Sequence, residues 1–392
     1  MSKPGPRLRE LDLLRFVAAL AVMFHHQVGG IAGWGVVNHH NLPGLAAVTH
    51  FGLLGVDLFF LVSGFVILMS AWDRGIGDFA VSRVVRIFPA YWFAVCLAMV
   101  VFVTTGIGLA RGPGSESMFR SFLPNLTMLE AGTGSPPLEI VYWTLWVEVH
   151  FYALIALLIW RGISYQRCVL FMGAWLLLGA FAQEAHFDLL TSFLFPQWAP
   201  YFIAGMAFYL TYRYGPNLVL GLFMGVCWAL AIYYRVSIVN KELVWPTVWP
   251  VVVSVVITVL FLLMWLVATR RLSWVSWRGS TVLGALTYPL YLVHETIRRP
   301  LQTWLAPQHS RWAVLAASVT AALIVAYLVH RFVERPAQRW LRPRLRRAVA
   351  QIRSGGLSEG LAITTSSSRP PRGQETASAK APEEVLAEAG AS

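Results

Sequence analysis

Apolar residues in this chain occur in long runs rather than in alternating or one-sided patterns. Each run approaches the about 20 residues that an α-helix needs to cross a bilayer. Glu184, His186 and Asp188 interrupt the region between the fifth run and the sixth. The pattern predicts an all-α, polytopic integral membrane protein of about ten transmembrane helices. The predicted spans are Leu11–Val28, Phe51–Ala71, Pro89–Gly106, Val141–Trp160, Cys168–Ala185, Phe193–Tyr212, Leu218–Tyr234, Thr247–Thr269, Thr281–Ile297 and Trp312–Val329.

The composition agrees with a membrane protein and explains the basic charge. Of the 392 residues, 57% are hydrophobic and 13% are charged, which is about half the charged fraction of a soluble domain. The formal net charge of +12 would suit a nucleic-acid partner, but the basic residues gather in alternate connections, which favours cytoplasmic termini, a multi-pass protein of the cell membrane and no nucleic-acid partner. The outer connections carry fewer basic residues, namely Arg111, Arg120, Arg235, Lys241, Arg298, Arg299 and Arg311.

Two regions differ in composition. Residues 1–347 form the predicted membrane domain, whereas residues 348–392, rich in Ser, Gly, Pro, Ala and Glu, are expected to form a disordered cytoplasmic tail. Cys96, Cys168 and Cys227 lie in or beside apolar runs without metal-ligand spacing, so we expect neither a metal site nor a disulfide framework.

Arg15 and His26 stand out because both lie on the first apolar run. At about 1.5 Å of rise per residue they lie roughly 16 Å apart along the helix, more than half of a hydrocarbon core of about 30 Å. Ionisable residues are costly in hydrocarbon and are therefore candidates for a functional site. A substrate that reached from one residue to the other would have to extend into the membrane.

The predicted topology sorts the other polar residues by depth into two layers. The inner layer groups Arg15 with Arg83 and Arg86. Ser63 falls near the middle of the second span. The outer layer is a set of candidate acids and bases, namely His26, Asp57, Glu148 and His294.

This layering suits the transfer of a group from one depth to another. Guanidinium groups remain charged and bind phosphate oxygens in pairs, and a histidine can remove a proton from a hydroxyl near neutral pH. An acyl-coenzyme A held by its phosphates at Arg15 could therefore extend its arm towards His26 or the neighbouring His25. The alternatives are positive-inside anchors for the arginines and polar helix packing for the acids and histidines.

Six local sequences, in order over residues 8–342, resemble the membrane acyltransferase-3 family. The family opens with an Arg and a His separated by ten residues, a spacing that selects Arg15 and His26 rather than His25. The other matching segments are Gly55–Phe65, Arg83–Trp92 with its Arg-x-x-Arg pattern, Trp143–Tyr152, Leu283–His294 and Phe332–Pro336.

The resemblance implies a membrane O-acyltransferase. Members of the family move an acyl group, commonly acetyl, from cytoplasmic acyl-coenzyme A to a hydroxyl of a carbohydrate-containing or macrolide-type acceptor. The donor is a co-substrate, and no bound cofactor is expected.

Carried over by position, the resemblance makes His26 the catalytic group and Arg15, Arg83 and Arg86 the donor-binding residues. Asp57 and Glu148 are added as acid/base or acceptor-orienting partners, with Ser63 and His294 as further candidates.

Two other functions stay open from the residues alone. A transporter could use the same buried Asp, Glu and His side chains as a proton relay, and would move its substrate without consuming coenzyme A. A regulatory or scaffold protein would tolerate the loss of both Arg15 and His26.

Overall fold

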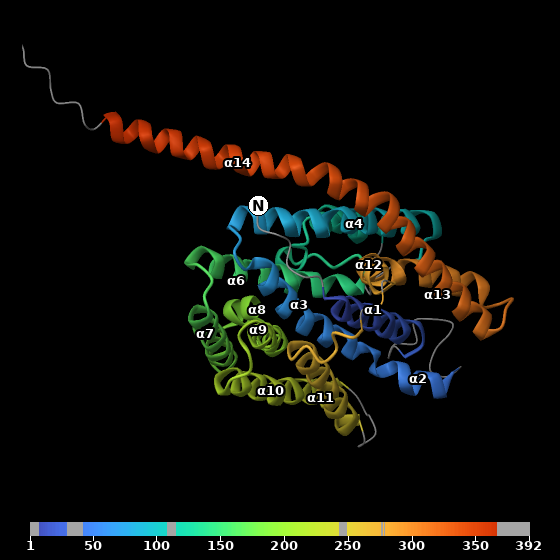
Figure 1. Ribbon diagram of the computed structural model, residues 1–392. Helices are drawn as coiled ribbons and strands as arrows, with labels where there is room; N and C mark the ends of the chain where they lie inside the picture. Colours follow the sequence, from blue (N-terminus) through green and yellow to red (C-terminus); the bar gives the residue numbers. More distant parts are fainter. Residues whose placement is uncertain are drawn as a thin grey trace, which may run out of the picture. The chain divides into compact units, whose positions relative to one another are not determined.

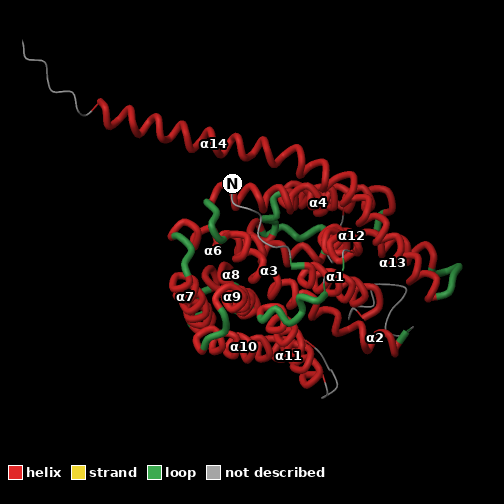
Figure 2. Tube along the Cα trace, viewed as in Figure 1, coloured by secondary structure: helices red, strands yellow, loops and turns green. Residues whose placement is uncertain are grey.

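The computed structural model describes residues 8–29, 42–107, 115–242, 249–275, 277 and 279–366. Within these ranges every regular element is a helix and no strand occurs (Figures 1 and 2). The described residues up to Arg346 belong to one compact unit, and Arg347 onwards to a second. The elements are α1 (Arg9–Phe24), the π-helix η1 (His25–Gly29), α2 (Pro43–Thr49), η2 (His50–Leu54), α3 (Gly55–Ala71), α4 (Ile76–Thr105), α5 (Ser115–Leu126), η3 (Ala131–Thr133), η4 (Ile140–Tyr142), α6 (Trp143–Arg161), α7 (Tyr165–Glu184), α8 (Asp188–Leu194), α9 (Ala199–Tyr214), α10 (Leu218–Glu242), α11 (Trp249–Ala268), α12 (Gly279–Leu305), α13 (Arg311–Leu328), the π-helix η5 (Val329–Glu334) and α14 (Arg335–Ser366).

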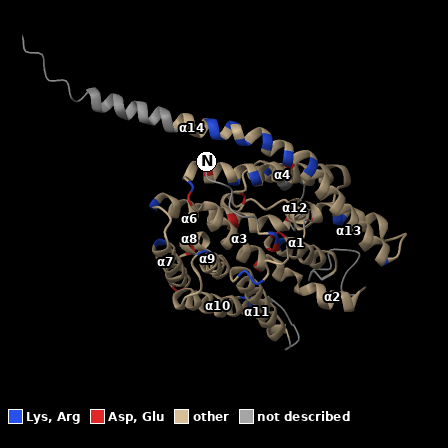
Figure 3. Cartoon of the chain, in the orientation of Figure 1, with Lys and Arg blue, Asp and Glu red and all other residues tan. Residues whose placement is uncertain are grey.

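Each predicted apolar run is largely helical in its described part, which confirms the all-α, polytopic prediction; Thr247 and Val248 lie outside the described residues. Most of the ribbon carries neither acidic nor basic residues (Figure 3). Eight helical segments are long and apolar enough to cross a membrane, rather than ten. The two runs that fall short are α9, which has only 16 residues, and α12, which carries Glu295, Arg298 and Arg299.

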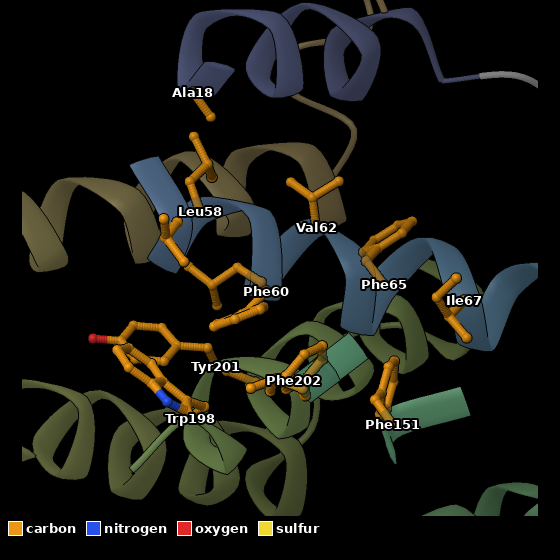
Figure 4. Packing of buried hydrophobic residues seen from close by; sticks show 14 of the residues in the cluster. Ala18, Leu58, Phe60, Val62, Phe65, Ile67, Phe151, Trp198, Tyr201 and Phe202 are labelled. Carbon is orange, nitrogen blue, oxygen red and sulfur yellow. The ribbon is translucent and has the colours of Figure 1, made fainter. Parts of the chain in front are cut away.

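Helix α3 lies between α1 and α9 (Figure 4). Residues of α9 are buried at nearly every position, and Phe202 packs on Phe60 of α3. The two backbones approach most closely at glycines, because a Cβ atom on Gly64 would overlap the Phe202 carbonyl and one on Gly205 would overlap the Leu61 carbonyl. Small residues allow this close helix contact, which is a main source of helix association in membranes.

Helix α12 packs against α1, α13 and α4. The expectation of a span ending at Ile297, with Arg298 and Arg299 in an outer connection, is wrong, because the helix continues to Leu305 and buries both arginines. Arg235 was also expected in an outer connection and instead lies buried in α10. In each case a buried carboxylate pairs with the guanidinium group, which a charge count along the chain does not reveal.

The last described helix runs past residue 347, the predicted end of the membrane domain. Helix α14 continues through residues 348–366, and the disordered tail over residues 348–392 stays a prediction. Helix-favouring residues such as Ala348, Ala350 and Gln351 extend the basic helix that begins at Arg335. Residues 367–392 lie outside the described residues.

One carboxylate of the connection between α5 and α6 is fully buried. Glu139 precedes η4 and accepts a hydrogen bond from the Thr296 hydroxyl of α12. Burial raises the pKa of Glu139 to about 8, and the Arg299 guanidinium offsets only part of that effect. Glu139 therefore holds its proton at pH values at which an exposed glutamate has released it.

The contact between α3 and α9 predicts that Gly205→Ala destabilises the protein. Overpacking at this crossing should cost about 1–3 kcal/mol, which would lower the temperature at which the detergent-solubilised protein loses its monodisperse elution. Gly221→Ala on α10 is the matched control, since an added Cβ there meets nothing within 4 Å. Equal behaviour of the two variants would contradict the close contact.

The burial of Glu139 predicts a pH-dependent stability. Between about pH 4.5 and 8 the folded state binds a proton that the unfolded state has released, so the free energy of unfolding falls as the pH rises through this window. The Glu139→Gln side chain cannot ionise. The melting temperature of this variant minus that of the wild type should therefore increase between pH 5 and 8. A constant difference across this range would contradict a raised pKa in the folded state.

Candidate active site

His26 lies where the first helix changes its winding. The α-helix α1 ends at Phe24 and continues as the π-helix η1, which holds His25 and His26. Short π-helical segments are frequent at functional sites. The buried side chain of Gln27 anchors the segment, because its Oε1 atom accepts hydrogen bonds from Gln302 Nε2 (2.8 Å) and Ser318 Oγ (2.9 Å).

His26 pairs with His294 of α12. The His26 Nδ1 and His294 Nε2 atoms lie 2.9 Å apart, and the two rings are near-parallel at 14°. His294 Nδ1 lies 3.1 Å from the Leu290 carbonyl oxygen, which can only accept, so His294 carries its proton on Nδ1. His294 Nε2 then accepts the Nδ1–H of His26, and the Nε2 lone pair of His26 remains available as a base. The His26 side chain is 22% exposed, which leaves it accessible.

Glu295 follows His294 and faces the same pair. Its Oε1 atom lies 4.0 Å from His26 Nδ1. Arg298 donates to both carboxylate oxygens at 2.8 Å, and Arg299 Nε donates at 3.3 Å. Neither Glu295 nor Arg298 was among the predicted site residues, although their spacing of three on one helix is a recognised signal for an ion pair.

His26, His294 and Glu295 also form a group that could hold a metal ion, because each offers a ligand atom and these atoms lie within 4.8 Å of one another. The sequence analysis expected no metal site. Two of the ligand atoms already share a hydrogen bond, and the carboxylate is occupied by Arg298. The contacts therefore describe a hydrogen-bonded pair with a neighbouring ion pair.

A cavity of about 630 Å³ opens beside the first turns of α1. Arg15, Arg83 and Arg86, predicted to bind the donor, all line it, together with the carboxylates of Asp12 and Glu334. The other arginines of its wall served in the sequence only as indicators of topology. One is Arg74, and the other three lie in the first turns of α14, where basic residues are frequent (Figure 3), namely Arg335, Arg342 and Arg346.

A second, small pocket of about 50 Å³, called the channel below, lies beside this basic cavity. Arg15 and Tyr288 line both spaces. Ser63 and Tyr291 also line the channel, and the Tyr291 ring centroid lies 6.0 Å from that of His294. The channel therefore shares wall residues with the basic cavity and has one wall residue next to the histidine pair.

Glu148 lies in the wall of this channel. Its Oε1 atom accepts hydrogen bonds from Ser63 Oγ (3.2 Å) and Tyr152 Oη (2.6 Å). Arg83 stacks over the Tyr152 ring at 5.9 Å. The structure therefore brings Ser63 and Glu148 together near the arginines, and no described hydrogen bond links Glu148 to His26.

Asp57 lies in a different environment. Its fully buried carboxylate accepts from Nε (3.0 Å) and Nη2 of Arg235, which donate to its two oxygens, and from Tyr201 Oη at 3.2 Å. The Arg235 guanidinium lies 4.8 Å from the centre of the Trp198 ring. In the part of the chain that the structure describes, no hydrogen bond or ion pair joins Asp57 to His26, so Asp57 connects α3 to α9 and α10.

Comparison with known proteins bears on this arrangement. Nodulation protein 10 of Rhizobium leguminosarum bv. viciae is 28% identical over 200 residues, which are 45% of this chain and 51% of that protein. The chain thus matches about half the length of this curated relative. No solved structure matches the chain.

A family model covers most of the chain. The model described as an acyltransferase domain matches residues 8–331, a range that contains the basic cavity's α1 and α4 arginines, the channel and the His26–His294 pair. The chain therefore belongs to the acyltransferase-3 family and is a polytopic membrane acyltransferase.

Proposed function

We propose that this protein moves an acyl group, in the first instance acetyl, from cytoplasmic acyl-coenzyme A to a hydroxyl of a carbohydrate-containing acceptor. The observation that carries the proposal is a shared wall: the arginine-lined cavity has Arg15 and Tyr288 in common with the channel, and the ring of the channel residue Tyr291 lies 6.0 Å from that of His294, the partner of His26. The family match supports acyl transfer rather than transport without chemistry.

The basic cavity suits the phosphates of the donor. Guanidinium groups bind phosphate oxygens bidentately and stay charged in a partly desolvated site. Arg15, Arg83 and Arg86 come from two different helices and surround one space of about 630 Å³, which lies within the range of ordinary ligand sites. With the phosphates bound there, the arm of the coenzyme would enter the channel.

His26 acts as the general base in this proposal. The acceptor hydroxyl gives its proton to His26 Nε2 while its oxygen attacks the thioester carbon. The carbon–sulfur bond then breaks, and His26 returns the proton to the sulfur as the free thiol leaves. His294 supports this role, because its hydrogen bond fixes the proton of His26 on Nδ1.

The acceptor and the membrane complete the proposal. We infer a cell-surface glycan, glycolipid or macrolide-type metabolite that meets His26 from the side opposite the basic cavity. This assignment rests on the family's range of acceptors. The positive-inside bias supports cytoplasmic termini and a cell-membrane location.

His26→Ala should abolish acyl transfer, since general-base catalysis contributes typically about 10²–10⁴-fold. The assay follows free thiol released from acetyl-coenzyme A in membrane vesicles of overproducing source cells, which contain the native acceptor. His25→Ala is the matched control, because this neighbouring histidine contacts His26 and His50 by its ring but has no described hydrogen bond at Nδ1. Full activity in His26→Ala would exclude the proposed role.

Arg83→Ala combined with Arg86→Ala should raise the KM for acetyl-coenzyme A by about 100-fold or more, because each lost hydrogen bond between charged groups is worth about 1.5–3 kcal/mol. The kcat at saturating donor should change less. Arg161→Ala provides the control, since this exposed arginine stacks on Trp160 and is not part of the cavity wall. An unchanged KM would remove Arg83 and Arg86 from the donor site.

A further inference from the structure

Glu295 is a buried carboxylate beside the catalytic pair whose role the proposed mechanism leaves unassigned. It is 1% exposed and accepts three hydrogen bonds from Arg298 and Arg299. Such an ion pair is costly to bury and is retained only with good geometry and further hydrogen bonds. Arg298 makes such a further hydrogen bond, because its Nη1 atom donates to Gln302 Oε1 at 3.2 Å.

The surroundings of His26 make Glu295 its dominant charged neighbour. The titratable and charged groups that act on His26 are Glu295, His294 and Arg298 from α12 and His25 from its own segment, with His50 of η2 behind His25. Glu295 is the one anion among these groups. Its Oε1 atom lies 4.0 Å from His26 Nδ1.

We propose that Glu295 is a positioning residue that stabilises the imidazolium formed on His26 during acyl transfer. This inference rests on the proposed function. Positive charge resides on the histidine pair only between removal of the acceptor proton and its return to sulfur, so a fixed carboxylate stabilises that stage more than the resting state. Arg298 and Arg299 hold the carboxylate ionised and oriented, and Glu295 itself takes up no proton.

The competing assignment is a metal site made of His26, His294 and Glu295. Nitrogen ligands at about 2.0–2.1 Å from a tetrahedral zinc ion lie roughly 3.3 Å apart. The nitrogen atoms of His26 and His294 lie 2.9 Å apart, which is a normal hydrogen-bond distance. The geometry therefore favours charge stabilisation.

Glu295→Gln tests the proposal in the thiol-release assay, because it keeps the shape of the side chain and removes its charge. We expect kcat to fall roughly 10²-fold with an unchanged KM for acetyl-coenzyme A. The acid limb of the pH–rate profile should move to lower pH, because the imidazolium loses its counter-charge. Glu295→Asp keeps the charge and should keep the limb near its wild-type position, even if its fold is less stable.

Glu139→Gln is the matched control, since it alters another fully buried carboxylate that contacts α12 and should leave kcat and the pH profile unchanged near neutral pH. Equal losses in the two glutamine variants, or wild-type kinetics in Glu295→Gln, would overturn the proposal. Activity that a chelator abolishes and zinc restores would overturn it in favour of a metal site. If Glu295→Gln is fully active while His26→Ala is inactive, the proposed function stands and only the role of Glu295 falls.

Discussion

The ion pair between Glu295 and Arg298 is the interaction on which the part of the site around His26 depends. Two charges inside a membrane protein cost several kcal/mol each in desolvation unless they are paired and hydrogen-bonded. Helix α12 carries both charges, and they pair with each other because the two residues are three positions apart on the helix. Its charged face is enclosed by protein, since α1, α13 and α4 pack around it. The same enclosure places His294 against His26, so the chemistry and the burial of charge have one structural cause.

The wall of the channel depends on close backbone contact between helices rather than on charge. Gly64 and Gly205 allow α3 and α9 to approach each other closely. Residues on neighbouring turns of α3 then form the channel wall, among them Phe59 and Ser63. Asp57 on the same helix joins α10 through Arg235 and α9 through Tyr201. These contacts hold α3 against α9 and α10, while Phe59 and Ser63 line the channel.

The all-α fold and the run boundaries could be predicted because the bilayer imposes a local rule, a stretch of about 20 apolar residues per span. The Arg15–His26 pair and the Arg83–Arg86 group were visible for a similar reason, since spacing along one helix fixes their relative depth. The family resemblance that these motifs carry is confirmed by the domain match.

The sequence could not predict which residues at the same depth in the membrane lie next to each other. Depth alone grouped Asp57 and Glu148 with His26, whereas the structure joins Asp57 to Arg235 and Glu148 to Ser63 and Tyr152. Packing between residues far apart in the chain decides which helices face each other, and the hydropathy of single segments does not indicate these contacts. For the same reason Arg298 was assigned to a connection, because a span with two adjacent arginines fails the apolar rule until its carboxylate partner is known.

The channel is too small to admit a donor arm, so donor binding in the cavity and reaction at His26 are separate steps. About 50 Å³ is room for a few water molecules and far below the 300 Å³ of a typical ligand site. Tyr288 Oη donates to the Ile87 carbonyl, and Tyr291 shares a 2.8 Å hydrogen bond with Thr144, so both rings are fixed in the channel wall. A donor arm needs more room than this, so its entry requires the channel to widen. Phosphate binding in the basic cavity could supply that free energy, since contacts remote from the reacting bond can drive rearrangements near it. Without a donor the narrow channel would hold only a few water molecules, and with one it would shield the thioester until the acceptor arrives at His26.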